Sequence, residues 1–420
     1  MRVMILAGHP FAGMPGRQQQ IALGLSALGH RVLYLDPFQL EPESDESSRA
    51  RLIVRAENER LHVMGRAAAT TPGAISEPPS DTVLPASVAQ SRGEWQAWAG
   101  QVRTLMEEMR QGDLFSSAEL TAAKKAGPPW GEEGVPEIVL LYPPMLIEAV
   151  RAASPVTIVF DCEEDFPATA ASRSLADAYE RALDRGLPLV DGLVGVNRYL
   201  VESWGTLLRP KVPTAVIEHG VDLKLFHPPG ARARQGARKA LRFSPDAKVA
   251  AYVGRLDARV SYEDLHFLLQ AEPDLRLLIL GEVNDEGRPI LDRLPGERIV
   301  VRGPLPQDEA ARFLAAADAI LIPLRREPHL EPVRGLTLYE YLATGLPVVG
   351  TFRRATKAFR DLFYLYTTQE ELAAAMRSAL SEPADAPVRK RRIEQAAGAD
   401  WESRARAMSE FLQEVLRAKA

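Results

Sequence analysis

The chain has 420 residues, of which 46% are hydrophobic and 25% charged, and its formal net charge at pH 7 is −5. This length and composition are typical of a globular protein with two domains rather than one core. The net negative charge and the lack of an overall basic field argue against nucleic acid as a partner.

Cysteines, histidines and apolar runs indicate the cellular context. The single cysteine excludes an intramolecular disulfide. No apolar run approaches the roughly 18 residues that a membrane span needs, and the start MRVMILAGHP predicts a strand rather than a signal peptide. The seven histidines lack the spacing of a zinc site, so we predict no metal. We therefore expect a cytoplasmic enzyme with at most peripheral contact at the inner face of a membrane.

The chain opens with a predicted βαβ unit. Apolar residues from Arg2 to Leu6 predict a strand, and a glycine-bearing loop follows from Ala7 to Gly16. A helix is expected from about Arg17 to Leu28, and a second strand from Arg31 to Leu35. The loop lies at the carboxyl end of the first strand, where open α/β sheets bind ligands. Its spacing is not G-x-G-x-x-G, so it does not predict a dinucleotide fingerprint.

Residues 40 to 134 carry weaker signals. We expect a strand from Leu61 to Met64 and a loop from Thr70 to Pro85, where Pro, Ser and Thr are frequent. An apolar stripe at helical spacing follows, and we expect it to pack on the first sheet. A membrane-interface helix is the alternative, but it needs a basic polar face, and this helix mixes acids and bases. The stripe consists of Trp95, Trp98, Val102, Leu105, Met106 and Met109.

The next two predicted strands extend from Ile138 to Leu141 and from Val156 to Phe160. An acidic run follows the second of them. The run extends from Asp161 to Asp165 and contains four carboxylates. Carboxylates beyond a strand end are costly unless they meet solvent, cations or a substrate. Solvated surface acids, or an N-cap for the next helix, are the alternatives to a functional role.

The rest of the chain alternates strands and helices, which predicts a second parallel sheet. Strands are also expected from Leu189 to Val196 and from Thr214 to Ile217. The arginine-rich stretch from Gly230 to Arg242 is expected to be an interdomain linker. Beyond it we predict a helix from Gln307 to Ala317 and strands at Val249 to Val253, Leu277 to Leu280, Ile299 to Val301 and Ala319 to Pro323.

The stretch from Arg334 to Thr351 predicts a short helix that leads into a buried strand. Gly345 is placed to end the helix, and Pro347 cannot continue it. The helix N-terminus is left open, and its unpaired N–H groups and partial positive charge suit a phosphate. Glu340 lies about one turn into the helix, where a carboxylate can accept hydrogen bonds from a ribose diol.

Four segments of the sequence resemble one family: FDCEEDF, HGVDLKLFHP, GRL and RGLTLYEYLATGLPVV, which start at Phe160, His219, Gly254 and Arg334. With these segments the chain resembles the GT-B glycosyltransferases, specifically the family-4-like group called glycosyl transferases group 1. The resemblance is strongest from 220 to 351 and weakest from 40 to 134.

The resemblance implies an α/β fold with two Rossmann-like, parallel-sheet domains that face a cleft. Residues 1–228 would form the acceptor domain, to which 397–420 return as a C-terminal helix. Residues 229–396 would form the nucleotide-sugar donor domain. The D-x-E pattern in the acidic run also imitates the metal-binding D-x-D of the other large glycosyltransferase fold. That fold has a single α/β domain, and the second half found here argues against it.

The resemblance places the donor site in the second domain. In the family the GRL loop clamps the donor pyrophosphate, and the planar fork of Arg255 suits phosphate oxygens. The family's lysine is missing, and Arg259 is the nearest cation. Glu340 would hold the ribose. The remaining residues implied for cofactor or donor binding are Gly254, Gly281, Arg302, Gly303, Gly335, Leu336 and Thr337.

In the first domain the resemblance implies that the glycine loop, with Gly13 and Gly16, faces acceptor and donor. Arg17 could contact a phosphate or a carboxylate, and a solvated arginine is the alternative. His30 stands in the family's G-H-x-V segment, and we expect a surface turn residue there rather than a catalyst. Like-charged neighbours raise the pKa of a carboxylate, so Asp161 or Glu164 would be the base if the enzyme inverts the anomeric centre.

The family's first glutamate of Glu-x7-Glu is displaced in this chain. Counting back from Glu340 gives Pro332, and Glu331 lies one position earlier. We therefore predict Glu331 as a catalytic residue that contacts the transferred sugar, with His329 and Arg334 as further candidates.

These residues predict a metal-independent glycosyltransferase that moves a sugar from a nucleoside-diphosphate sugar, by default a UDP-sugar, to a hydroxyl acceptor. We expect no tightly bound cofactor. The acceptor would be a saccharide, a lipid-linked intermediate or a small molecule, in bacterial polysaccharide or glycoconjugate synthesis. A catalytically silent GT-B subunit that binds a nucleotide sugar or a partner transferase is one alternative, and a nucleotide-sugar epimerase is another. Retention and inversion both stay open.

Overall fold

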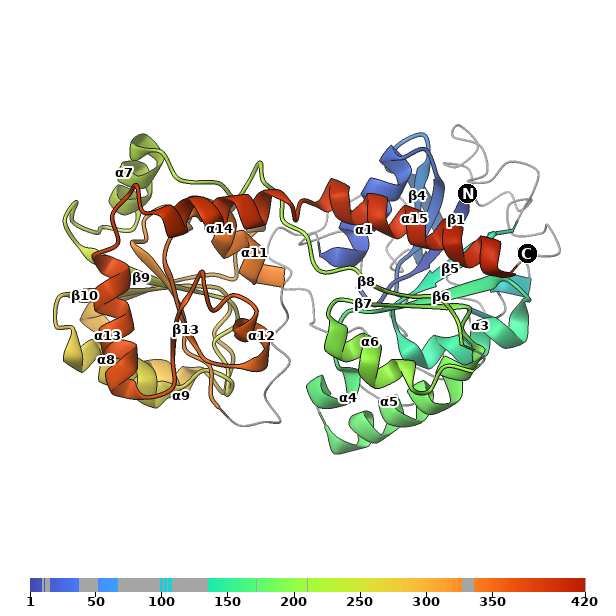
Figure 1. Ribbon diagram of the computed structural model, residues 1–420, viewed down its shortest axis with the longest axis horizontal. Helices are drawn as coiled ribbons and strands as arrows, with labels where there is room; N and C mark the ends of the chain where they lie inside the picture. Colours follow the sequence, from blue (N-terminus) through green and yellow to red (C-terminus); the bar gives the residue numbers. More distant parts are fainter. Residues whose placement is uncertain are drawn as a thin grey trace, which may run out of the picture. The chain divides into compact units, whose positions relative to one another are not determined.

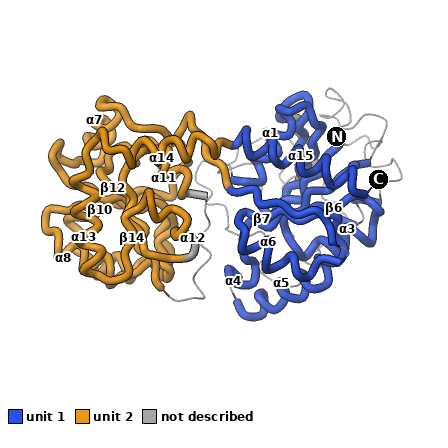
Figure 2. The backbone as a smooth tube through the Cα atoms, in the orientation of Figure 1, with its two compact units in different colours: residues 1–218, 401–420 blue, residues 219–400 orange. Residues whose placement is uncertain are grey.

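The computed structural model describes residues 1–9, 11, 16–37, 52–66, 99–100, 102–103, 105–107, 135–170, 172–209, 211–326 and 336–419. It divides into two compact units (Figure 2). Unit 1 comprises Met1–Glu218 and Trp401–Ala420, and unit 2 comprises His219–Asp400. Each unit contains one sheet with helices around it (Figure 1).

Unit 1 contains an eight-stranded sheet in the order β3-β4-β2-β1-β5-β6-β7-β8. All neighbouring strands pair in parallel except β3 and β4, which form an antiparallel pair at one edge. The strands are β1 (Arg2–Leu6), β2 (Arg31–Leu35), β3 (Leu52–Ala56), β4 (Leu61–Arg66), β5 (Ile138–Leu141), β6 (Thr157–Cys162), β7 (Gly192–Gly195) and β8 (Thr214–Val216).

Helices cover this sheet in two apolar layers, and alternate residues of β1 point into each. Met4 and Leu6 join the layer that contains α3 and α5, whereas Val3 and Ile5 join the layer that contains α1 and α15. A parallel strand buried on both faces is apolar throughout, which explains why RVMIL forms β1. The helices are α1 (Arg17–Ala27), η3 (Pro144–Leu146), α3 (Ile147–Ala153), α4 (Phe166–Thr169), α5 (Arg173–Gly186), η4 (Leu187–Leu189), α6 (Arg198–Gly205) and α15 (Trp401–Lys419).

The C-terminal helix α15 belongs to unit 1 and crosses α1 closely (Figure 1). A Cβ atom added to Gly24 would lie 2.2 Å from the Cβ of Ala405, so only glycine fits at this crossing. His30 Nε2 lies 2.7 Å from Ser409 Oγ on α15, and His30 is buried. The expectation of a surface turn residue at His30 is therefore wrong, because the ring bonds the returning helix.

Unit 2 contains a six-stranded parallel sheet in the order β11-β10-β9-β12-β13-β14. Alternation again fills two layers: Val249 and Ala251 face α10, α11 and α14, whereas Ala250 and Tyr252 face α8 and α13. The strands are β9 (Lys248–Val253), β10 (Leu275–Leu280), β11 (Ile299–Arg302), β12 (Ala319–Ile322), β13 (Val348–Thr351) and β14 (Tyr364–Tyr366). The helices are α7 (Ala231–Ala240), α8 (Tyr262–Ala271), α9 (Arg288–Asp292), η5 (Gly296–Arg298), α10 (Gln307–Leu314), α11 (Leu336–Thr344), α12 (Arg354–Lys357), α13 (Gln369–Leu380) and α14 (Pro387–Ala397).

The arginine-rich stretch expected to be a linker is instead the helix α7 of unit 2. Arg234 and Arg238 both bond the carboxylate of Asp318, and Arg238 Nη2 lies 2.7 Å from it. Asp318 also accepts the backbone N–H of Val249 at 2.8 Å, which ties α7 to the start of β9. The linker expectation is therefore wrong, because Arg234 and Arg238 pair with an aspartate of the same unit, whose side chain is 24% exposed.

The unit boundaries differ from the predicted ones, which lie after residues 228 and 396. The structure places the changes after Glu218 and after Asp400. The backbone N–H of Val221 donates to Ala399 O at 2.9 Å, so the two connecting segments bond each other within unit 2.

The apolar stripe predicted to pack on the first sheet does so where it is described. Val102, Leu105 and Met106 are buried in the same layer as Met4 and Leu6. Trp95, Trp98 and Met109 lie outside the described residues. Among the helices described, none has the length and apolar character to cross a membrane.

Candidate functional site

The carboxyl edge of the unit 2 sheet is made of closely packed backbone. Gly254, Gly281 and Gly303 follow β9, β10 and β11, and all have positive φ angles, of 140°, 148° and 134°. A Cβ atom on Gly281 would lie 2.1 Å from Gly254 O, and one on Gly303 would lie 2.6 Å from Gly281 O. Only glycine fits such an approach. The sequence therefore brings three predicted site residues together at one edge.

Two arginines follow Gly254, and each forms an ion pair. Arg255 Nε lies 3.0 Å from Glu282 Oε2, and the two side chains are 39% and 35% exposed. Arg259 donates three hydrogen bonds to Asp257, of 2.6 to 3.0 Å, and Asp257 is only 10% exposed. Arg255 is thus held by an exposed pair, whereas Arg259 is held more firmly by a partner two residues away.

Glu340 is buried on α11, which is fixed to the same sheet edge. Tyr341 donates its hydroxyl to Val253 O at 2.9 Å, at the end of β9. Glu340 is 5% exposed, and its Oε1 accepts a hydrogen bond of 2.6 Å from Gln307 Nε2. Burial raises the pKa of Glu340 from 4.5 to about 7, and the hydrogen bond from Gln307 opposes this. The site thus contains a carboxyl group whose charge changes near neutral pH.

The remaining predicted site residues differ in how far the structure describes them. Gly13, Glu331 and Gly335 lie outside the described residues, as do His329 and Arg334. Leu336 and Thr337 form the first turn of α11, and the structure describes only their helical backbone. Arg302 is exposed, and its Nη1 donates to Val301 O at 2.9 Å.

At the carboxyl edge of the unit 1 sheet, Arg17 and Asp161 form a buried ion pair. Arg17 Nε and Nη2 donate to the two carboxylate oxygens of Asp161 at 2.9 and 3.0 Å, and both side chains are 0% exposed. Arg17 Nη1 also donates to Glu218 O at 3.1 Å. Burial by itself lowers the pKa of Arg17, but the Asp161 carboxylate outweighs it and the pKa is raised. Arg17 therefore contacts a carboxylate of the protein and is not solvated.

A second polar network lies beside this pair. Gln18 Oε1 accepts the backbone N–H groups of Gly8 and His9 at 2.8 and 3.2 Å, and Gln18 Nε2 donates to Glu163 Oε1 at 2.7 Å. His9 Nε2 lies 3.8 Å from the same oxygen. The side chain of His9 is 31% exposed and that of Glu163 is 13% exposed. Gly16, a predicted site residue, begins α1 here, and its N–H donates to Gln19 Oε1 at 3.0 Å.

The remaining acids of the run have separate roles. Asp165 caps α4 by accepting the N–H of Ala168 at 3.3 Å, which is the N-cap alternative considered for this run. Burial raises the pKa of Asp165, and its bond to Ala168 lowers it. Glu164 is half-buried, and its backbone oxygen accepts the thiol of Cys162 at 3.2 Å. Among the described residues, no three His, Cys, Asp or Glu side chains are grouped to hold a metal ion.

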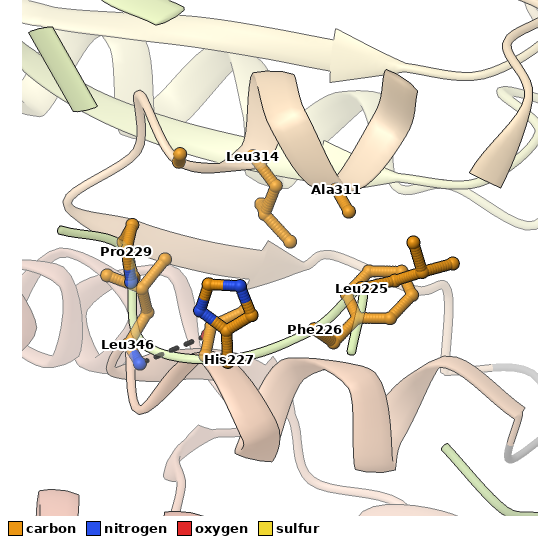
Figure 3. A pocket seen from close by; sticks show the side chains of 9 residues that line it. Leu225, Phe226, His227, Pro229, Ala311, Leu314 and Leu346 are labelled. Carbon is orange, nitrogen blue, oxygen red and sulfur yellow. Dashed lines mark hydrogen bonds between the residues drawn. The ribbon is translucent and has the colours of Figure 1, made fainter. Parts of the chain in front are cut away.

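A separate small pocket in unit 2 lies between α10 and the segment from Leu225 to Pro229 (Figure 3). Phe226, His227 and Leu314 are among its lining residues. Its cavity volume of about 20 Å³ has room for a water molecule but not for a nucleotide sugar. None of the predicted site residues lines it, so we do not assign it to the site.

Comparisons with known proteins find a family match within unit 2. The family described as Glycosyl transferases group 1 matches residues 247–382. The chain is 24% identical over 260 residues to a Bacillus subtilis (strain 168) protein named as a teichuronic acid biosynthesis glycosyltransferase, TuaH, and this match covers 58% of the chain and 64% of the relative. It is 35% identical over 158 residues to a D-inositol 3-phosphate glycosyltransferase of Corynebacterium urealyticum (strain ATCC 43042 / DSM 7109), covering 34% and 35%. The chain thus spans less than two thirds of the length of either relative.

Solved structures give the fold of the whole chain. A sucrose-phosphate synthase from Thermosynechococcus elongatus has a TM-score of 0.67 at 17% identity, with 99% of both chains covered. An E. coli structure described as trehalose-6-phosphate bound with UDP-2-fluoro glucose has a TM-score of 0.66 at 13% identity, also with 99% of both covered. Residues 247–382 of unit 2 match the group 1 glycosyltransferases, and the chain has the GT-B fold. Both the predicted fold class and the family resemblance are confirmed.

All the predicted site residues that are described in unit 2 lie within the matched range, which includes Gly254, Gly281, Gly303 and Glu340. Glu282, the partner of Arg255, and Gln307, the partner of Glu340, lie there too and were not predicted. In unit 1 the pair of His9 and Glu163 was not predicted from the sequence. The available signal was the position of each residue just beyond the carboxyl end of a parallel strand.

Proposed function

We propose that this protein transfers a glycosyl group from a nucleoside-diphosphate sugar to a hydroxyl acceptor, and that unit 2 binds the donor. The observation that carries this proposal is the glycine edge formed by Gly254, Gly281 and Gly303. The close packing of these glycines holds the strand ends together at the edge where open α/β sheets bind nucleotides. The group 1 match over the same residues supports this function.

In this proposal Arg255 stabilises the diphosphate that leaves. Its present partner is Glu282, and a pair this exposed is worth only about 0 to 1 kcal/mol, so a phosphate can replace the carboxylate. The guanidinium can then hold phosphate oxygens bidentately, and charge stabilisation of this kind is a large catalytic term. Arg259 is the weaker candidate, because Asp257 already occupies its donors.

Glu340 is proposed to accept hydrogen bonds from the donor ribose, and α11 to direct its N-terminus at the diphosphate. The helix begins at Leu336 and has nine residues, and the partial positive charge at its start favours an anion. Gly335, Thr337, Arg302 and Glu331 stay proposals for the same donor site, the last for contact with the sugar.

UDP is the proposed nucleotide, since one structural neighbour is described with UDP-2-fluoro glucose and another, from Anabaena, with UDP and glucose. The acceptor is proposed to be a hydroxyl of a saccharide, a lipid-linked intermediate or a small molecule. The name of the Bacillus subtilis relative supports a place in bacterial polysaccharide synthesis.

In unit 1 Asp161, which the sequence offered as a candidate base, is not proposed for that role. Arg17 occupies both of its carboxylate oxygens, and neither side chain is exposed. A buried, bidentate pair of this kind is structural, because a base must reach the proton that it removes. Glu164 is half-buried and stays the candidate base taken from the sequence.

The experiment is a panel of UDP-, GDP-, ADP- and dTDP-glucose with glucose, glucose 6-phosphate and D-inositol 3-phosphate as acceptors. Arg255→Ala and Glu340→Ala are expected to lower kcat/KM by roughly 100-fold or more. Arg391→Ala and Glu394→Ala change exposed residues of α14 and should leave it unchanged. Binding of a nucleotide without turnover of any donor would instead favour the silent subunit, which the names of the relatives do not favour. The anomeric proton coupling of the product decides between retention and inversion.

A further inference from the structure

A further arginine at the carboxyl edge of unit 2, Arg326, follows β12, the strand next to β9 in the sheet. A carboxylate from the core holds it, since Arg326 Nη2 donates to Asp264 Oδ2 at 3.2 Å. We propose that Arg326 binds an oxyanion of the donor and that Asp264 positions it. The oxyanion is either the diphosphate or a carboxylate on the sugar. This inference rests on the proposed function, because it adds a residue to the donor site of unit 2.

The pair has one member in the core and one at the surface. The side chain of Asp264 is 1% exposed, whereas that of Arg326 is 41% exposed. A carboxylate this deeply buried is costly, and apolar residues in place of a buried ion pair are often as stabilising or more so. The neighbours of Asp264 on α8, Leu265 and Leu268, are apolar and pack in the core. The pair is therefore better explained by what its exposed guanidinium binds than by the stability of unit 2.

Two further contacts fix the guanidinium. Tyr366 donates its hydroxyl to the same Asp264 oxygen at 2.9 Å, and the guanidinium carbon of Arg326 lies 5.5 Å from the centre of the Tyr366 ring. Burial, and next the Asp264 charge, raise the pKa of Tyr366, so the hydroxyl keeps the proton that it donates. Thr351 Oγ1 lies 3.1 Å from that hydroxyl and accepts the backbone N–H of Leu324 at 3.0 Å. The network thus holds both the side chain of Arg326 and the backbone just before it.

The backbone that carries Arg326 is also bonded to the loop after β9. Ser261 N–H, at the end of that loop, donates to Pro323 O at 2.7 Å. The same loop carries Arg255, which is proposed to stabilise the diphosphate. The two arginines therefore come from segments that bond each other at the ends of neighbouring strands, where open α/β sheets bind ligands.

The side chain of Arg326 is only partly occupied. Among the described residues, Asp264 is its one hydrogen-bond partner. The pKa of the exposed Glu371 is lowered chiefly by hydrogen bonds from Thr367 and Thr368, and least by the charge of Arg326, so this acid is bound at the start of α13 instead. A guanidinium held through one nitrogen keeps donors for two oxygens of a phosphate or a carboxylate.

The test measures the binding of UDP, UDP-glucose and UDP-glucuronate to the full chain by calorimetric titration. Arg326→Gln is expected to weaken binding by roughly 10- to 100-fold, because charged hydrogen bonds are lost. A loss shared by all three ligands assigns the diphosphate, and a loss confined to UDP-glucuronate assigns a sugar carboxylate. Arg312→Gln is the matched control and should keep wild-type affinity. Arg312 also pairs with an acid, Glu309, and lies over an aromatic ring, that of Phe313, but it belongs to α10.

The positioning role of Asp264 is tested through its dependence on Arg326. Asp264→Asn keeps the shape of the side chain and an acceptor for Tyr366 but removes the charge, so we expect a smaller loss of affinity, of roughly 3- to 10-fold. In the Arg326→Gln background the same change should cause no further loss, because a positioning residue acts only through the residue that it holds. Thermal unfolding of each variant checks that it is folded.

Three results overturn this inference alone. They are wild-type affinity for all three ligands in Arg326→Gln, an equal loss in Arg312→Gln, and a loss from Asp264→Asn that is the same with and without Arg326→Gln. A wild-type protein that binds none of UDP, GDP, ADP and dTDP overturns the donor site of unit 2 together with the inference, so the two failures are distinguishable.

Discussion

The two units complete the carboxyl edges of their sheets in different ways. In unit 2 the edge is backbone, where Gly254, Gly281 and Gly303 approach one another too closely for any side chain. In unit 1 the edge is filled by polar side chains that bond each other across the sequence, with Arg17 on Asp161 and Gln18 on Glu163. One edge consists of glycine backbone packed on glycine backbone, and the other presents a fixed network of charges.

This difference corresponds to the two kinds of group that a glycosyltransferase must hold. Main-chain N–H groups and a helix start suit a diphosphate, because they offer partial positive charge without the desolvation cost of many side chains. A hydroxyl acceptor needs a directed proton acceptor instead, and that requires a side chain whose position is fixed by others. The comparison is consistent with the proposal that unit 2 binds the donor.

Removing the cation from the buried pair of unit 1 should have the largest effect. Arg17→Met leaves the Asp161 carboxylate buried without its cation, and we expect a loss of about 3 to 5 kcal/mol in the free energy of unfolding. Urea unfolding measures it. The double variant Arg17→Met with Asp161→Leu removes both charges and should recover most of the loss. A single variant as stable as the wild type would contradict the burial of this pair.

Filling the glycine edge of unit 2 is the next largest perturbation. Gly281→Ala forces a Cβ into contact with Gly254 O at a φ of +148°, and strain plus backbone displacement should cost roughly 3 to 4 kcal/mol. The affinity for UDP should fall as well, since the edge is the proposed donor site. Gly296→Ala is the matched control in the same unit, because a Cβ there has no neighbour within 4 Å. Equal effects in the two variants would contradict a close backbone approach at Gly281.

Features of the two units that depend on neighbouring residues in the chain could be predicted from the sequence. Gly254, Gly281 and Gly303 each follow a predicted apolar strand, and the family resemblance implied them as donor-site residues. The helix around Glu340 was equally local, with Gly345 and Pro347 ending it. The first-half strands β1, β2 and β5 were predicted with the bounds they have, because buried parallel strands are continuous apolar runs.

What the sequence could not predict depends on contacts between distant residues. Arg17 and Asp161 are 144 positions apart, and nothing near either residue predicts the other. A lone arginine at a helix start was therefore compatible with a phosphate, a carboxylate or solvent. The arginines of α7 predicted an exposed linker for the same reason, since their partner Asp318 lies 80 positions beyond Arg238.

Glu340 allows a pH test of the buried part of the donor site. Its pKa is raised from 4.5 to about 7 by burial, so the folded state keeps its proton to higher pH than the unfolded state. Stability from this group is full below pH 4.5 and is lost as pH rises to about 7, which corresponds to at most roughly 3 kcal/mol. Unfolding at pH 4.5 and pH 8 without nucleotide should show Glu340→Gln gaining relative to the wild type at the higher pH. Glu394→Gln is the exposed control, and a gain of the same size there would contradict burial as the cause.

The smallest expected effect concerns the exposed pair of Arg255 and Glu282, which we propose competes with the donor. Glu282→Gln should change the free energy of unfolding by less than about 1 kcal/mol, since both side chains are more than a third exposed. The same change frees Arg255 for phosphate, so the affinity for UDP should rise by up to roughly fivefold at low salt, and by less at high salt. Calorimetric titration at two salt concentrations measures this, with Glu286→Gln, an exposed acid a few residues further along the chain, as the control. A weaker affinity for UDP in Glu282→Gln would mean that Glu282 orients Arg255 for the phosphate rather than competing with it. The proposed donor site of unit 2 would then depend on a side-chain pair, as the edge of unit 1 does.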